Sequence, residues 1–310
     1  MSRFSASSWV VRGLAVLAVG LAALPSLAAD PAQLAFKTPE AAVKALVRAA
    51  RAADAKQMLA LFGPGSEDLV ASGDPVQDAG DLKNFARAYA RHHRLIESTP
   101  DRRVVAVGSP EFLLPVPLVR ADDGWRFDGA SGAAELVYER IGRNELGAIA
   151  TLLGGVEAQL EYRRRNPERH APPVYAKHLV SEPGRKNGLY WPAERPDEQS
   201  PAGELVARAS DEGYGGGTDV AYHGYYFRLL KAQGPSAFGG AKSYEVDGEL
   251  ADGFAFVAWP AQYRASGVMT FIVNQEGVVY QKDLGEDSEA IARAMTAFDP
   301  GEGWVAVDGT

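Results

Sequence analysis

The densest group of polar side chains lies in Glu139-Arg140-Ile141-Gly142-Arg143-Asn144-Glu145. On a helix, Arg140, Arg143 and Asn144 lie within one turn, so their donors could converge on an anionic group such as a carboxylate. Glu145 follows them on the same helix and completes the candidate binding group. Alternatively, these arginines form buried or interdomain ion pairs that lock the helix to the first domain. The sequence favours this second interpretation, because arginine suits such interface pairing.

Aromatic residues form the second group of candidate binding residues, which comprises Tyr190, Trp191, Tyr225, Tyr226 and Trp259. Successive strand residues face opposite sides of a sheet, so Tyr225 and Tyr226 must point apart. Some of these rings therefore belong to the core. The others predict a surface that grips a peptide, a glycan or an envelope protein, since Tyr and Trp are favoured anchors.

Signatures of catalysis are missing from the sequence. It lacks a G-x-S-x-G elbow, an H-E-x-x-H motif, a P-loop and a dinucleotide fingerprint. With no Cys and five His, it predicts no catalytic residues, no metal ligands and no cofactor. His223 is predicted to hydrogen-bond within a sheet, and the acidic loop around Asp247 and Asp252 is more typical of solvated turns than of a calcium site.

Two classes of function stay open. A non-enzymatic binding or assembly module is favoured, because the nucleophile and metal signatures are missing. The alternative is a hydrolase or small-ligand enzyme with a pocket in the first domain. A deep pocket with convergent titratable groups would favour the enzyme, whereas a shallow aromatic strip would favour binding.

Residues 1–29 read as a signal peptide. Arg3 and Arg12 precede a short apolar run, residues 13–23, and small residues suited to cleavage follow Pro25. That run is well under the roughly 20 residues that a spanning helix needs, and no later segment is long enough. We therefore expect a periplasmic or secreted protein. The net charge of −8 and the pI near 5.3 argue against nucleic-acid binding.

The first mature region, residues 30–130, is predicted to place helices on a curved antiparallel sheet. Thr38-Pro39-Glu40 is a typical helix start, since Thr caps well and Pro suits the first turn. The patterns predict further helices over 58–62 and 82–93. They predict strands over 103–108, 112–120 and 125–127, with a turn at 122–124.

The second region, residues 131–310, is predicted to pack a long helix on an antiparallel meander, so the whole chain is α+β. The helix covers 133–164 with a break or kink near Gly154-Gly155, and Asn166-Pro167 ends it. The hairpin Val268–Gly285 is expected to close the meander as its last pair. The other elements expected are short helices over 175–179 and 201–209, strands over 222–230 and 254–259, and a terminal helix over 288–297.

Two fold families resemble parts of the chain. The segments TPEAAVKALVRAA and PLVRADDGWRFD resemble the nuclear-transport-factor-two-like cone fold. Ala158-Gln159-Leu160-Glu161-Tyr162, Gly224-Tyr225-Tyr226-Phe227, Ala258-Trp259-Pro260 and 267–280 resemble the globular head of type II secretion pseudopilins. The hydrophobic pilin N-terminus is missing, so this resemblance implies a pilin-like head without the filament.

Nearly the whole mature chain resembles the bacterial exported family known as domain of unknown function 2950. The segments that carry this resemblance include ALFGPGSEDLVASGDPV, ERIGRNELGAIA, NGLYWP, YHGYYFRLLKAQGPSAFGGA and SGVMTFIVNQEGVVYQKDLG. The resemblance implies an exported protein of a family without an assigned biochemical activity.

Overall fold

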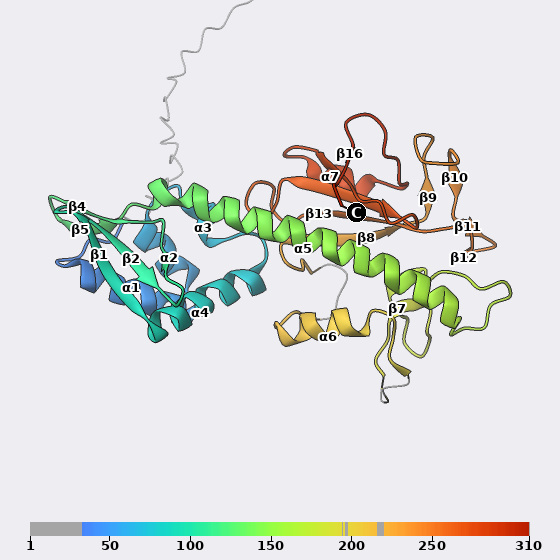
Figure 1. The fold of residues 1–310 in the computed structure, drawn as a ribbon, viewed down its shortest axis with the longest axis horizontal. Helices are drawn as coiled ribbons and strands as arrows, with labels where there is room; N and C mark the ends of the chain where they lie inside the picture. Colours follow the sequence, from blue (N-terminus) through green and yellow to red (C-terminus); the bar gives the residue numbers. More distant parts are fainter. Residues whose placement is uncertain (1–32, 194, 196–197, 216–219, 310) are drawn as a thin grey trace, which may run out of the picture. The chain divides into compact units, whose positions relative to one another are not determined.

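Helices and antiparallel sheets make up the described part of the chain, which confirms the predicted α+β class (Figure 1). The structure is a computed structural model that describes residues 33–309 apart from 194, 196–197 and 216–219. The predicted signal peptide, residues 1–29, lies outside the described residues. Within the described ranges, no helix combines the length and apolarity needed to cross a bilayer.

The helices follow the chain in two groups separated by the first sheet. The described helices are α1 (Pro39–Ala52), α2 (Ala55–Phe62), α3 (Glu67–Val70), α4 (Pro75–Arg91), α5 (Gly129–Arg165), α6 (Gly203–Asp211) and α7 (Ser288–Ala294). Thr38 accepts a hydrogen bond from the Ala41 amide, so the predicted start of α1 is confirmed. Asp54 accepts one from the Gln57 amide, and α2 therefore begins three residues before the predicted 58–62.

The predicted helix over 82–93 has different bounds. Asp74 caps α4 by accepting hydrogen bonds from the Val76 and Gln77 amides, and Pro75 occupies the first helical position. The helix therefore starts seven residues earlier than the prediction. It ends at Arg91, and His93 begins a strand that the sequence analysis missed.

The first sheet has the order β1-β2-β4-β5, with β3 paired to β2. Its strands are β1 (His93–Thr99), β2 (Arg102–Val107), β3 (Phe112–Leu113), β4 (Leu118–Ala121) and β5 (Gly124–Phe127). The strand predicted over 112–120 is thus divided in two, because Pro115 and Pro117 interrupt it. The inner face of this sheet and helices α1 and α2 enclose one hydrophobic core, which includes Leu46, Leu61, Leu118 and Phe127.

Helix α5 has 37 residues, so it is about 55 Å long. The predicted break near Gly154-Gly155 is wrong, because the helix continues without interruption through both glycines. Gly155 instead permits a close approach: a Cβ at this position would lie 3.3 Å from the Phe256 ring. The missing side chain thus serves packing between α5 and the second sheet.

The second sheet has the antiparallel order β16-β15-β14-β13-β8. Its strands are β8 (Tyr225–Leu230), β13 (Ala255–Pro260), β14 (Met269–Asn274), β15 (Tyr280–Asp283) and β16 (Val305–Ala306). The predicted hairpin is present as β14 and β15, but β16 pairs beyond it, so the hairpin is not the last pair of the meander. Every residue of β13 is buried, as expected for a strand in the middle of a sheet.

Three pairs of short strands lie in the remaining described residues of the second half. They are β6 (His178–Val180) with β7 (Gly188–Tyr190), β9 (Ala232–Gln233) with β10 (Lys242–Ser243), and β11 (Glu245–Val246) with β12 (Glu249–Leu250). The helix predicted over 175–179 is wrong, because Tyr175 instead forms a bridge with Leu250. All described residues belong to one compact unit, and the division into two domains at residue 130 stays a prediction.

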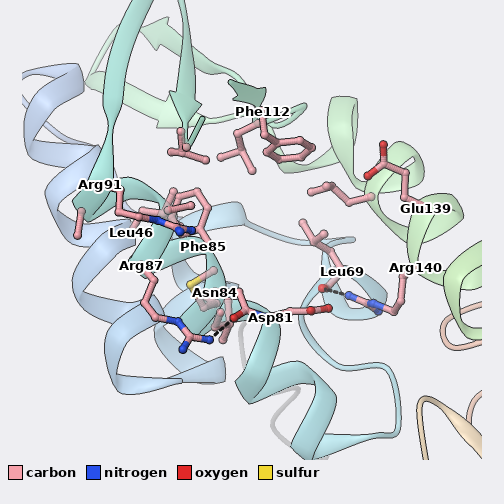
Figure 2. Close-up of a pocket in the computed structure, with 18 of the residues that line it drawn as sticks. Leu46, Leu69, Asp81, Asn84, Phe85, Arg87, Arg91, Phe112, Glu139 and Arg140 are labelled. Carbon is pink, nitrogen blue, oxygen red and sulfur yellow. Dashed lines mark hydrogen bonds between the residues drawn. The ribbon is translucent and has the colours of Figure 1, made fainter. Parts of the chain in front are cut away.

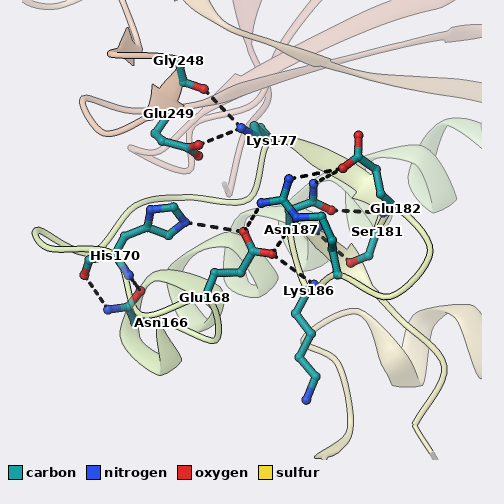
Figure 3. A network of polar contacts seen from close by, with 12 residues as sticks. Asn166, Glu168, His170, Lys177, Ser181, Glu182, Lys186, Asn187, Gly248 and Glu249 are labelled. Atoms are coloured by element: carbon teal, nitrogen blue, oxygen red, sulfur yellow. Dashed lines mark hydrogen bonds and ion pairs between the residues drawn. The ribbon is translucent and has the colours of Figure 1, made fainter.

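Glu168 organises the loop that follows α5 (Figure 3). Its carboxylate accepts hydrogen bonds from both Nε and Nη2 of Arg185, at 3.2 and 2.9 Å, and from the Lys186 amide. His170 Nε2 lies 3.5 Å from the same carboxylate. Burial raises the pKa of Glu168, but the bonds from Arg185 and Lys186 outweigh it and hold the pKa below its ordinary value.

We predict that Glu168→Gln destabilises the protein by about 1–2 kcal/mol at neutral pH, because it removes charge-assisted hydrogen bonds. A depressed carboxyl pKa contributes stability that is present above the ordinary value of 4.5 and lost as the pH falls through the folded pKa. Urea unfolding at several pH values should therefore show a difference in the free energy of unfolding between the unchanged protein and Glu168→Gln. This difference should disappear as the pH falls through the folded pKa of Glu168. Glu157→Gln, at an exposed position of α5, is the control. A constant difference at all pH values would contradict the assignment.

Candidate functional site

A cavity of about 890 Å³ opens in the first half of the described chain (Figure 2). This volume lies within the range of small-molecule sites. Apolar side chains of the helices and of the first sheet line it: Leu46, Met58, Phe62, Leu69, Val70, Leu82, Phe85, Val107, Phe112, Leu114 and Leu136. We call this cavity the apolar pocket.

Charged residues also line the apolar pocket, from α4 and α5. Arg87 and Arg91 project from α4, and Glu139 lies on the opposite side, on α5 (Figure 2). Arg143 forms an exposed ion pair with Asp81, with 3.2 Å between Nη2 and Oδ2. The apolar walls therefore carry a polar rim, with Arg87 and Arg91 on α4 and with Glu139 and Arg143 on α5.

Arg140 lies in the wall of the pocket but its donors are already engaged. It is only 7% exposed, and its guanidinium donates to the carbonyls of Asp68 at 2.7 Å, Leu69 at 2.6 Å and Ala265 at 3.4 Å. Burial lowers its pKa, and the nearby acids Asp78 and Asp81 act in the opposite direction. The guanidinium thus fixes the segment around α3 and the loop after β13 against α5.

Asn144 and Glu145 make further contacts from α5 to other parts of the chain. The side-chain amides of Asn144 and Gln77 exchange two hydrogen bonds, at 2.8 and 3.1 Å. The Asn144 side chain also donates to the Ser266 carbonyl. Glu145 Oε1 accepts from the Val268 and Met269 amides, each at 3.0 Å. The predicted polar cluster therefore contacts mostly backbone and amide groups. Its only ion pair in the described structure joins Arg143 to Asp81.

Gly224 is required where α5 meets the start of β8. Its φ is +75°, and a Cβ there would lie 2.4 Å from Nδ2 of Asn144. A side chain would therefore meet both the left-handed backbone and the buried amide. The close approach lets the Gly224 amide donate to Oδ2 of Asp74, at 2.9 Å.

The predicted aromatic group divides between core and surface. Tyr225 is fully buried, and its hydroxyl donates to the Met269 carbonyl. Tyr226 is half-buried, and its ring lies 5.7 Å from that of the buried Trp259. The Arg293 guanidinium lies over both rings, at 5.5 and 5.4 Å, so the exposed side of this pair is already covered by a cation.

Tyr190 and Trp191 lie at the end of β7. Trp191 is buried, packs edge-on against Tyr162 and donates from Nε1 to the Glu198 carbonyl. Tyr190 is half-buried and pairs with Val180 in the parallel ladder. Among the described residues no ring contact joins Trp191 to the pair of Tyr226 and Trp259.

A second cavity, of about 1290 Å³, is more polar and is lined by α4, the end of α6 and the segment before β8. His223 and Glu212 meet there, with 2.6 Å between Nε2 and Oε2. The side chain of His223 therefore pairs with the end of α6 and not within the sheet as predicted. Asp74 lies beside this cavity, only 1% exposed, and accepts from the Tyr214 hydroxyl at 2.8 Å.

The residues that form the apolar pocket were not predicted from the sequence. The helices predicted after Thr38 and over 82–93 gave no indication that Leu46 and Phe85 share a cavity, and Arg87 and Arg91 were not singled out. One signal was available: Arg87 and Arg91 are four residues apart on a helix, with no acid three or four residues from either. Like charges at this spacing destabilise a helix, so the two arginines indicate a role other than helix stability.

Metal binding has no structural support in the described ranges, where no group of three His, Asp or Glu side chains is placed to hold an ion. Asp247 and Asp252 are both outside any such group.

The comparison with protein families gives one match, to the family described as "Protein of unknown function (DUF2950)", over residues 33–307. The chain belongs to this family. The match confirms the resemblance to domain of unknown function 2950. No curated protein and no solved structure matches the chain.

We predict that Arg140 and Arg143 differ sharply in their contribution to stability, although they are three residues apart on α5. Arg140→Leu leaves buried carbonyls without donors and should cost about 2–4 kcal/mol. Arg143→Leu removes an exposed ion pair and should cost less than about 1 kcal/mol. Urea unfolding of both variants measures the difference, and equal losses would show that Arg140 does not hold the segments together.

Proposed function

We propose that the protein is an exported envelope protein without catalytic activity that binds the apolar part of a small ligand in the apolar pocket. The observation that carries this proposal is the cavity of about 890 Å³ with walls from α1, α2, α4, α5 and the first sheet. An apolar cavity of this size with a few polar groups at its rim is the usual form of a small-ligand site. The signal-like residues 1–29 support export.

Binding is favoured over catalysis by the state of the polar groups in the pocket wall. Arg140 is engaged with backbone carbonyls, and Asp81 is paired with Arg143. Ser109 lines the pocket, but no histidine accompanies it in that lining. A hydrolase would need a base beside its nucleophile. The apolar surface therefore supports uptake of a ligand better than turnover.

The proposal includes an architecture in two parts. The first part is a domain of the nuclear-transport-factor-two-like type, which supplies most of the pocket, and α5 of the second part completes the wall. The second is a domain like a pseudopilin head, without the hydrophobic helix that would build a filament. The half-buried Tyr190 is the aromatic candidate for contact with an envelope protein, a peptide or a glycan, because Arg293 already covers the Tyr226 ring.

Filling the pocket should abolish ligand binding. Ala88 and Leu136 line it from α4 and α5, and a tryptophan at either position takes up ligand space. We predict that the protein binds the neutral fluorescent probe Nile red, and that Ala88→Trp or Leu136→Trp weakens binding at least about tenfold, in line with an overpacking cost of ~1–3 kcal/mol. Fluorescence titration measures both.

The matched control is Ala150→Trp, which adds the same ring to an exposed position of α5 outside the pocket. It should bind Nile red as the unchanged protein does. Thermal melting establishes that each variant is folded. Full binding by folded Ala88→Trp and Leu136→Trp proteins would contradict a ligand site in the apolar pocket.

Export is tested with residues 1–29 alone, fused to a reporter enzyme that becomes active only outside the cytoplasm. We expect an active reporter, because the positive start, the apolar run and the small residues form an export signal. Replacing Leu17 and Val19 by Asp in the apolar run should abolish the activity. An inactive fusion, expressed to the same level, would contradict export.

A further inference from the structure

Arg87 and Arg91 are the notable charges on the rim of the apolar pocket. They lie one turn apart on α4, both are exposed, and both line the cavity. Among the described residues neither forms an ion pair, whereas the neighbouring Arg94 is bound by Glu111 through two hydrogen bonds, both at 2.7 Å. The two guanidiniums on α4 thus face the pocket without a carboxylate partner in the described structure.

Structural roles account for only part of this arrangement. Arg91 lies in the last turn of α4, where a cation interacts favourably with the helix dipole. Arg87 lies a full turn earlier. Its positive charge and that of Arg91, four residues away, repel each other and destabilise the helix. Arg87 donates to the side chain of Asn84, which holds the guanidinium at the rim (Figure 2).

The charges around the pocket define the complementary ligand. Its lining contains four arginines, but Arg140 is engaged with carbonyls and Arg143 with Asp81. Arg87 and Arg91 remain on one side and Glu139 on the other (Figure 2). This arrangement of charges suits a ligand with a single negative charge, placed on the α4 side of the opening of the apolar pocket.

We propose that the apolar pocket binds a carboxylate-bearing amphiphile, such as an unbranched fatty acid, with its carboxylate between Arg87 and Arg91. This inference rests on the proposed function and specifies its ligand class. A guanidinium recognises a carboxylate through two parallel hydrogen bonds. The alkyl chain then lies against the apolar walls, where its burial from water supplies most of the affinity.

The unchanged protein gives the first test, because it needs no variant to fold. Dodecanoate, dodecanol and dodecylammonium share one chain length and differ in the charge of the head group. We measure the dissociation constant of each ligand by its displacement of Nile red. We expect dodecanoate to bind at least about tenfold more tightly than dodecanol, and dodecylammonium to bind most weakly. Added salt should weaken dodecanoate binding and leave dodecanol unchanged.

The variant Arg87→Gln with Arg91→Gln should lose the preference for dodecanoate over dodecanol. The matched control is Arg48→Gln with Arg120→Gln, which removes the same charge from exposed positions outside the pocket. This control should keep the preference. Thermal melting of both double variants reports their folding.

The outcomes separate the two proposals. Equal binding of dodecanoate and dodecanol by the unchanged protein would overturn the carboxylate inference and leave the apolar site standing. A preference that survives in the folded Arg87→Gln, Arg91→Gln protein would also overturn it. If neither dodecanol nor Nile red binds, the proposed function itself is wrong.

Discussion

Arg140 imposes the constraint on which the rest of the structure depends. It is a buried cation on α5, and a buried guanidinium is tolerated only when its donors are satisfied. Here the acceptors are the backbone carbonyls of Asp68, Leu69 and Ala265. One side chain therefore fixes two segments, nearly 200 residues apart in the sequence, against one helix.

The apolar pocket follows from this arrangement. The bonds from Arg140 hold Leu69 at the wall of the cavity, and α5 supplies Leu136 from the same helix. The first core closes on its other sides through α1, α2 and the sheet, but the side chains of these elements do not fill the space near α4. The exposed arginines on α4 give this apolar space a mouth that a charged group can occupy.

Local signals in the sequence predicted many of the elements well. The cap at Thr38 located the first helix, and alternation around residues 268–283 located a hairpin, because each signal depends only on near neighbours. The start of α4 was missed although Asp74-Pro75 is the same kind of signal. The glycines at 154 and 155 were misinterpreted, since only the distant Phe256 shows that Gly155 serves packing.

The candidate site was less predictable, because a cavity depends on distant contacts. The cluster from Arg140 to Glu145 was found, and most of its contacts proved to be with backbone and amide groups from distant segments. No spacing in the sequence indicates that Leu46, Phe85 and Phe112 face one empty volume. The methionines allow that volume to be tested directly, since Met58 lines the pocket while Met269 and Met295 pack against the hydrophobic core around the second sheet.

The most direct measurement is therefore an NMR titration of protein labelled with ¹³C at its methionine methyl groups, with dodecanol as the neutral ligand. Ligand binding in the apolar pocket should shift the Met58 signal until it saturates, while the Met269 and Met295 signals stay in place. An unshifted Met58, or shifts confined to Met269 and Met295, would contradict ligand binding in the apolar pocket.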